Sequence, residues 1–119
     1  MIDKKLKTMI ERNNLALATI DKSNKPNVVF VSCVKVVSKY QILITDNYMN
    51  KTKRNILDNK NCSIAITDSK QDCGYQLKGT ARYFSSGKWT KQVKALKENK
   101  GLPAKGAVVV TIKEIINLA

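Results

Sequence analysis

The chain has 119 residues, a length that suits one folded domain spanning residues 1–119. Hydrophobic residues make up 43% of it, which excludes an intrinsically disordered chain. The net charge of +13 attracts phosphates, nucleic acids or anionic membranes, although lysines dispersed over a solvated surface would give the same excess. No apolar run approaches the ~20 residues needed to cross a bilayer, and the charged N-terminus does not resemble a secretory signal. We therefore expect a cytoplasmic protein with no membrane partner.

The first 45 residues predict one helix and three strands. Ile2, Leu6, Met9 and Ile10 recur at helical spacing, and Asp3 is available as the N-cap. Strands rich in β-branched residues are predicted at residues 15–20, 27–37 and 42–45. We expect these three strands to form a meander.

The rest of the chain predicts three further strands and two further helices. The strands lie at residues 62–67, 75–84 and 107–116, and the helices at residues 50–58 and from Ser85 or Ser86 to Leu96. Asn50 would cap the first of these helices, which would pack through Ile56 and Leu57. Gly79 suggests a bulge or a close backbone approach. About six strands with two to three short helices predict a mainly β, α+β fold, a small β-barrel with helical decoration.

Several kinds of catalytic site are excluded by residues that the sequence lacks. There is no histidine, so neither a Ser-His-Asp nor a Cys-His unit can be built, and no acidic cluster has metal-site spacing. The three cysteines are far apart, which does not support disulfides or zinc; we expect Cys33 and Cys62 in the core and Cys73 exposed. We assign no catalytic side chain and no metal ligand, so a cofactor would have to supply any chemistry.

The most informative segment runs over residues 45–54, between a strand and a helix. Lys51, Lys53 and Arg54 fall in the first helical turn, where the helix dipole disfavours cations. An anion bound at this helix start would explain them, and a phosphate is the natural candidate. The alternative is that they are ordinary exposed side chains of a lysine-rich protein, and both interpretations stay open.

Four motifs in order resemble those of a known family. They are PNVV at residues 26–29, ILITDNYMNKT at residues 42–52, GYQLKGTA at residues 74–81 and LPAKGAVVV at residues 102–110. Together they resemble the pyridoxamine 5′-phosphate oxidase-like family, especially its short, single-domain FMN-binding members. The resemblance covers nearly the whole chain, from about residue 15 to residue 118.

The resemblance implies an FMN-binding split β-barrel that forms a homodimer with the cofactor at the interface. The implied FMN-binding residues fall into four groups. Lys51 and Thr52 would hold the phosphate; Thr45, Asp46 and Asn47 would contact the ribityl chain and the flavin edge; Val29, Phe30 and Val31 would line the ring; and Leu102 and Pro103 of the other subunit would cover it.

The resemblance favours a flavin-dependent oxidoreductase or electron-transfer protein with a small-molecule or protein redox partner. True pyridoxamine-phosphate oxidase activity is not favoured, because the chain ends without the C-terminal Trp-, Arg- and Pro-containing extension of those enzymes. Two alternatives stay open. Phe30, where relatives often carry Pro or a polar residue, could fill the flavin's place in a flavin-free scaffold protein. A nucleic-acid-binding barrel would need lysines on one face with exposed aromatic side chains.

Overall fold

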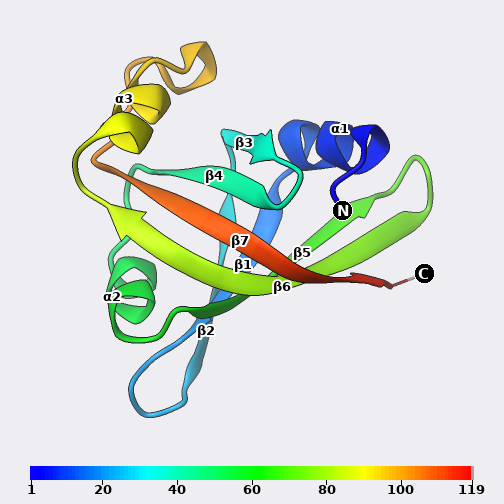
Figure 1. Ribbon diagram of the computed structural model, residues 1–119, viewed down its shortest axis with the longest axis horizontal. Coiled ribbons are helices and arrows are strands. Elements are labelled where there is room, and N and C mark those ends of the chain that lie inside the picture. The colour runs from blue at the N-terminus through cyan, green and yellow to red at the C-terminus, as the bar shows by residue number, and fades with distance from the viewer. Residues whose placement is uncertain (119) are drawn as a thin grey trace.

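The computed structural model describes residues 1–118 and places seven strands and three α-helices there (Figure 1). The strands are β1 (Leu15–Ile20), β2 (Pro26–Val31), β3 (Val34–Ser38), β4 (Gln41–Asp46), β5 (Asn61–Asp68), β6 (Cys73–Phe84) and β7 (Gly106–Asn117). The helices are α1 (Lys4–Arg12), α2 (Lys51–Asp58), α3 (Lys88–Lys94) and the 3₁₀-helix η1 (Lys97–Asn99). None of these helices is long and apolar enough to cross a membrane.

All seven strands form one antiparallel sheet in the order β2-β1-β5-β6-β7-β4-β3. The two edge strands, β2 and β3, are consecutive in the chain and are joined only by Ser32 and Cys33. A flat sheet of seven strands would separate its edges by about 29 Å, which two linking residues cannot span at ~3.5 Å each. The sheet must therefore curl until its edges meet, and the predicted mainly β, α+β barrel is confirmed (Figure 1).

The strand count and the meander need correction. Residues 27–37, predicted as one strand, form both β2 and β3 because Cys33 adopts a left-handed backbone conformation with φ of 55°. The first three predicted strands do not form a meander, because the β1–β2 and β3–β4 hairpins lie at opposite edges of the sheet. β5, β6 and β7 lie between these hairpins and complete the sheet.

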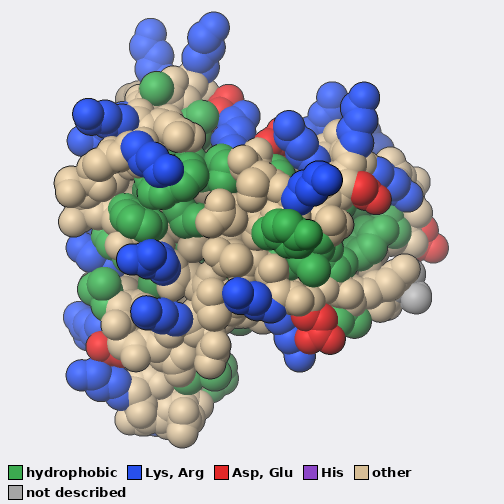
Figure 2. Space-filling model, viewed as in Figure 1, with side chains coloured by type: hydrophobic (Ala, Val, Ile, Leu, Met, Phe, Trp, Pro, Cys, Tyr) green, Lys and Arg blue, Asp and Glu red, His purple; other side chains and the backbone are tan. Residues whose placement is uncertain are grey.

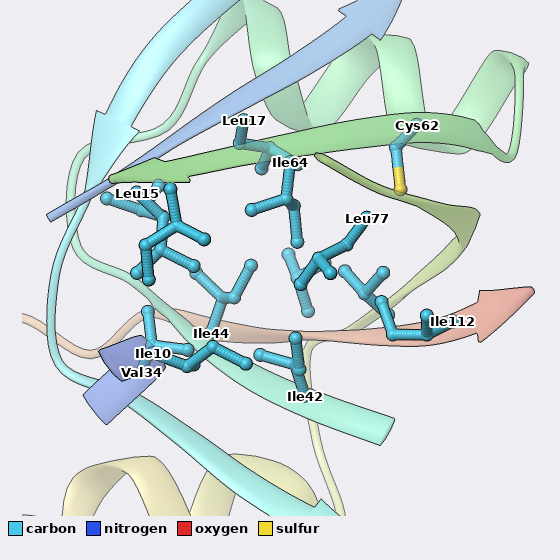
Figure 3. Packing of buried hydrophobic residues seen from close by; sticks show 14 of the residues in the cluster. Ile10, Leu15, Leu17, Val34, Ile42, Ile44, Cys62, Ile64, Leu77 and Ile112 are labelled. Carbon is cyan, nitrogen blue, oxygen red and sulfur yellow. The ribbon is translucent and has the colours of Figure 1, made fainter. Parts of the chain in front are cut away.

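The core fills the inside of the curled sheet. Alternate residues of the strands point inward, among them Leu15 and Leu17 of β1 and Ile42 and Ile44 of β4, all fully buried (Figure 3). Helix α1 closes one side by packing on β3 and β5 through Leu6, Met9 and Ile10. As predicted, Asp3 caps this helix, its carboxylate accepting a hydrogen bond of 2.8 Å from the backbone N–H of Leu6.

Two helix predictions were partly wrong. Asn50 is the N-cap residue of α2, but its side chain makes no capping hydrogen bond, and Leu57 is 63% exposed while Ile56 is buried. Asn55, buried beside Ile56, takes the place expected for Leu57 and donates to the hydroxyl of Thr19 at 3.1 Å. The next helix begins at Lys88, after Gly87, rather than at Ser85 or Ser86, because Gly87 has the φ of 95° that glycine tolerates.

Gly79 marks both features predicted for it. The pairing of β6 with β7 shifts register between Lys78 and Gly79, and a Cβ atom at Gly79 would lie 2.0 Å from the carbonyl oxygen of Thr111.

We expect Gly79→Ala to lower the free energy of unfolding by about 1–3 kcal/mol, because the backbone of β7 must move away. Chemical denaturation would measure this loss. Gly74→Ala, where the nearest contacts are 3.3 Å, is the matched control on the same strand. Equal stability losses in the two variants would contradict the close approach of β6 and β7 at this point.

Candidate functional site

A cavity of about 450 Å³ opens where β2, the end of β4 and the start of α2 meet. Figure 1 shows α2 beside β2 at one end of the sheet. The lining residues are Asn27, Val29, Phe30, Val31, Ser32, Thr45, Asn47, Tyr48, Met49, Asn50, Lys51, Thr52 and Leu102. The volume falls within the roughly 300–1,000 Å³ typical of small-molecule sites.

Strand β2 provides an apolar wall of this cavity. Val29 and Val31 share one face of the strand, because side chains alternate, and both pack toward the core. Phe30 belongs to the opposite face and is 80% exposed. Its ring therefore stands at the rim of the cavity, which weakens the idea that it fills the space of a bound ring.

Hydroxyl and amide groups line the middle of the cavity. The Thr45 hydroxyl donates to the carbonyl oxygen of Cys33 at 3.3 Å, which ties β4 to the β2–β3 connection. The Thr52 hydroxyl accepts from the side-chain amide of Asn27 at 3.3 Å, and Thr52 is 2% exposed. These contacts fix polar groups that can hydrogen-bond a polyhydroxylated chain.

The start of α2 forms the cationic end of the cavity. No side chain caps this helix and no acidic residue lies in its first turn, so its first N–H groups are available to an anion. The Lys51 ammonium lies 3.7 Å from a carboxylate oxygen of Asp21 in the β1–β2 turn. Hydrogen bonds from the backbone N–H groups of Lys25 and Ser23, together with the charge of Lys51, hold the pKa of Asp21 below its usual value. Asp21 therefore stays ionised and pairs with Lys51, the first residue of the helix.

Asp46 lies beneath the cavity rather than in its wall. Its carboxylate is fully buried and accepts a hydrogen bond of 2.7 Å from the N–H of Met49 and one of 2.5 Å from the Tyr83 hydroxyl. Burial, and then the contact with Asp46, raise the pKa of Tyr83, so this hydroxyl keeps the proton that it donates. Lys105 reinforces the turn, since its ammonium donates to the carbonyl oxygen of Met49 and lies 4.0 Å from Asp46. Asp46 thus fixes the turn that leads into α2.

Asn47 holds the segment after α3 against the cavity. It exchanges hydrogen bonds of 2.7 and 3.0 Å with the side chain of Asn99, and its oxygen also accepts from the N–H of Ala104 at 2.9 Å. This brings Leu102 of the same chain to the cavity, while the cover by the Leu102–Pro103 connector of a second subunit stays a prediction. Pro103 borders a separate hollow formed by residues 94–104.

The other two predicted cations of α2 do not reach the cavity. The Lys53 ammonium lies 4.8 Å from the centroid of the Tyr83 ring on β6, and neither Lys53 nor Arg54 is part of the cavity lining. Of the three cations predicted to bind an anion at the helix start, only Lys51 therefore lines the cavity.

The cysteines do not form a reactive site. Cys62 is buried as predicted, and burial raises the pKa of its thiol to about 12. The other two predictions were wrong, because both thiols are half-buried: Cys33 donates to the carbonyl oxygen of Glu98, and Cys73 lies 3.8 Å from the sulfur of Met9.

The structure thus gathers eight of the ten predicted residues around one cavity and leaves Asp46 and Pro103 outside its wall. Sequence reasoning missed several lining residues: Asn27, Ser32, Tyr48, Met49 and Asn50. Asn27 could have been predicted, because side chains alternate along β2 and Asn27 shares a face with Val29 and Val31. Four further residues contact the lining residues or the turn that leads into α2: Asp21, Tyr83, Asn99 and Lys105. No sequence pattern indicated these contacts, because the partners lie far apart in the chain.

Comparison with known proteins gives a consistent result. The family model described as pyridoxamine 5′-phosphate oxidase matches residues 2–119. An uncharacterized protein of Methanocaldococcus jannaschii is 42% identical over 115 residues, 92% of this chain and 75% of that protein. HupZ of Group A Streptococcus superposes with a TM-score of 0.90 at 26% identity, covering 99% of this chain and 94% of that one. An FMN-binding protein of Syntrophomonas wolfei superposes with a TM-score of 0.77 at 18% identity, covering 95% and 83% of the two chains.

These matches extend over nearly the whole chain and agree with its curled seven-stranded sheet. The chain therefore belongs to the pyridoxamine 5′-phosphate oxidase-like split-barrel family.

Proposed function

We propose that residues 1–119 form one FMN-binding domain of a flavoprotein that works as a homodimer in oxidoreduction or electron transfer. The observation that carries this proposal is the cavity whose apolar wall leads past fixed hydroxyl groups to the uncapped, lysine-bearing start of α2. FMN has the same three parts in the same order, namely a flat ring, a polyhydroxylated chain and a phosphate. The similarity to an FMN-binding protein of the same fold supports this choice of cofactor.

The residues present fit FMN in charge and polarity. Lys51, Thr52 and the first N–H groups of α2 would hold the phosphate, because a helix start stabilises an anion and Lys51 adds a full positive charge. Thr45 and Asn27 would face the ribityl chain, and Val29 and Val31 would contact the ring. When bound, FMN would supply the redox chemistry, and the chain would bind it, orient it and exclude water.

Apolar side chains around the cavity mouth support the homodimer. Phe30, Tyr48 and Leu102 all line the cavity, and they are 80%, 74% and 43% exposed. Contiguous exposed apolar groups at the rim of a site are typical of surfaces that another chain covers. The unpaired Cys33, Cys62 and Cys73 fit a reducing, cytoplasmic compartment.

A paired titration tests the cofactor assignment. We expect FMN to bind at least about tenfold more tightly than riboflavin, because a charge-assisted phosphate contact contributes about 1.5–3 kcal/mol. Quenching of flavin fluorescence would give both affinities, and analytical ultracentrifugation would give the oligomeric state. Equal affinities for the two flavins would contradict the phosphate site, and a monomer that binds FMN tightly would contradict the shared interface.

A further inference from the structure

Five lysines follow one another at every third position in and after α3. They are Lys88, Lys91, Lys94, Lys97 and Lys100, here called the lysine segment, and all five are exposed. Figure 2 shows blue side chains projecting from the end of the molecule that carries α3 and the loop after it. The role inferred for this segment rests on the proposed function.

Local geometry turns this spacing into a charged surface. Residues three apart are neighbours on an α-helix, so Lys88, Lys91 and Lys94 lie along one side of α3. Val93 and Thr90 of the same helix are buried, and α3 packs on β7 and β4. Lys97 begins η1 and Lys100 follows its last residue, so these two lysines add positive charge in the segment directly after α3.

Within residues 1–118, only one of these charges makes a contact in the fold, that of Lys88 over the Trp89 ring. Among the described residues no carboxylate forms an ion pair with any of the five lysines. The segment's one acidic residue, Glu98, pairs instead with Lys35 at 3.1 Å. Two of the five lysines lie in the last turn of α3, where the helix dipole favours cations, but this leaves their charges exposed to solvent. The lysine segment therefore presents five exposed positive charges with no carboxylate partner in the described part of the chain.

The lysine segment is fastened to the cofactor cavity. Asn99, within it, exchanges hydrogen bonds with Asn47, and the thiol of Cys33 donates to the carbonyl oxygen of Glu98. Leu102, two residues after Lys100, lines the cavity itself. A protein docked on the lysines would therefore lie beside the cavity, next to the mouth that the second subunit covers in the proposed homodimer.

We infer that the lysine segment is the docking surface of an acidic electron-carrier protein that exchanges electrons with the bound FMN. Opposite charges steer rapid, weak association, which is what transient redox partners require. The carrier would lose one electron to FMN at each encounter. Two encounters, with two protons from solvent, would reduce FMN fully by two electrons.

The aromatic residues favour a protein over a nucleic acid. Base stacking needs exposed rings between the cations, but the one aromatic residue of the segment, Trp89, is half-buried in the core cluster around Val93. The Lys88 ammonium also covers its ring at 4.7 Å from the centroid. The exposed aromatic side chains that line the cavity, Phe30 and Tyr48, belong to the cavity mouth instead.

Binding to an oxidised, acidic plant-type ferredoxin tests this inference by calorimetry on the FMN-loaded protein. We expect binding that weakens as ionic strength rises from about 0.05 to 0.5 M, since screening shortens over that range. The triple variant K91E/K94E/K97E should weaken binding by at least about tenfold, and the milder K91Q/K94Q/K97Q should weaken it by a smaller factor. K4E/K5E/K7E on α1 makes the same change of six charge units as the first variant and should change binding by less than about twofold.

Three results would overturn the inference. They are equal losses in the α3 and α1 triple variants, binding as tight to basic cytochrome c as to ferredoxin, and a DNA duplex that binds more tightly than ferredoxin and is released by K91E/K94E/K97E. Failure of the proposed function would look different: the wild-type protein would not retain FMN, whatever its affinity for ferredoxin.

Discussion

Replacing Asp46 with alanine is expected to lower the free energy of unfolding by about 3–5 kcal/mol, the largest effect of any single substitution considered. The change removes two hydrogen bonds to a buried carboxylate, each of which contributes about 1.5–3 kcal/mol, and leaves the Met49 N–H and the Tyr83 hydroxyl without their acceptor. Because this is a large part of the 5–15 kcal/mol that typically separates folded from unfolded states, the variant could fail to fold. Urea denaturation followed by circular dichroism would measure the loss.

Tyr83→Phe tests the same contact more gently. It removes one of the two hydrogen bonds, so we expect a loss of about 1.5–3 kcal/mol. Tyr75→Phe on the same strand is the matched control, because the Tyr75 hydroxyl makes no hydrogen bond among the described residues. If both variants unfold at the same urea concentration, Asp46 does not fix the turn as described.

The raised pKa of Tyr83 adds a pH dependence to this contact. Its folded pKa lies above the ordinary value of 10.0, mainly because of burial, so the proton is held more tightly in the folded than in the unfolded protein. The contribution to stability is therefore complete below pH 10 and is lost as pH rises from there toward the folded pKa. We expect the wild-type protein to lose more stability than Tyr83→Phe in this range, as urea midpoints at successive pH values would show.

Lys51→Ala is expected to weaken FMN binding by about 1.5–3 kcal/mol, or about 10–150-fold in the dissociation constant. The variant removes the cation that lines the cavity at the start of α2 and leaves the apolar wall of β2 unchanged. Riboflavin, which has no phosphate, should bind the variant and the wild-type protein alike. Fluorescence titration with both flavins would measure the two effects separately.

Lys53→Ala is the control for this substitution. It removes the same charge from the same helical turn, but the Lys53 side chain lies over Tyr83 and not in the cavity. We expect less than about a twofold change in FMN affinity. Equal losses in the two variants would mean that overall charge, and not a specific contact of Lys51, attracts the phosphate.

Much of the fold could be predicted because its signals are local. Helical spacing and the N-cap Asp3 predicted α1, and alternating apolar residues predicted most strands. Gly79 predicted the close approach of β6 to β7. The break at Cys33 was missed, because a left-handed residue other than glycine inside a run of β-branched residues leaves no pattern in the sequence. The pairing of β4 with β7 depends on contacts about 65 residues apart, which periodicity cannot reveal.

In the candidate site, too, local features could be predicted and long-range contacts could not. The excess of cations at the start of α2 predicted an anion site there, and both Lys51 and Thr52 line the cavity. The roles of Asp46 and Asn47 could not be predicted, because each depends on partners from distant strands and loops, Tyr83 for one and Asn99 for the other. Sequence patterns indicated many of the residues that surround the cavity. The hydrogen bonds that hold them in place are seen only in the structure.

The central claim is that this cavity holds FMN, and the visible absorption spectrum of the purified protein tests it most directly. The protein would be incubated with excess FMN, desalted and measured again. Our account predicts that the two visible flavin bands persist at one FMN per chain and are shifted relative to free FMN by the apolar surroundings of Val29 and Val31. A protein that is colourless after desalting would contradict it.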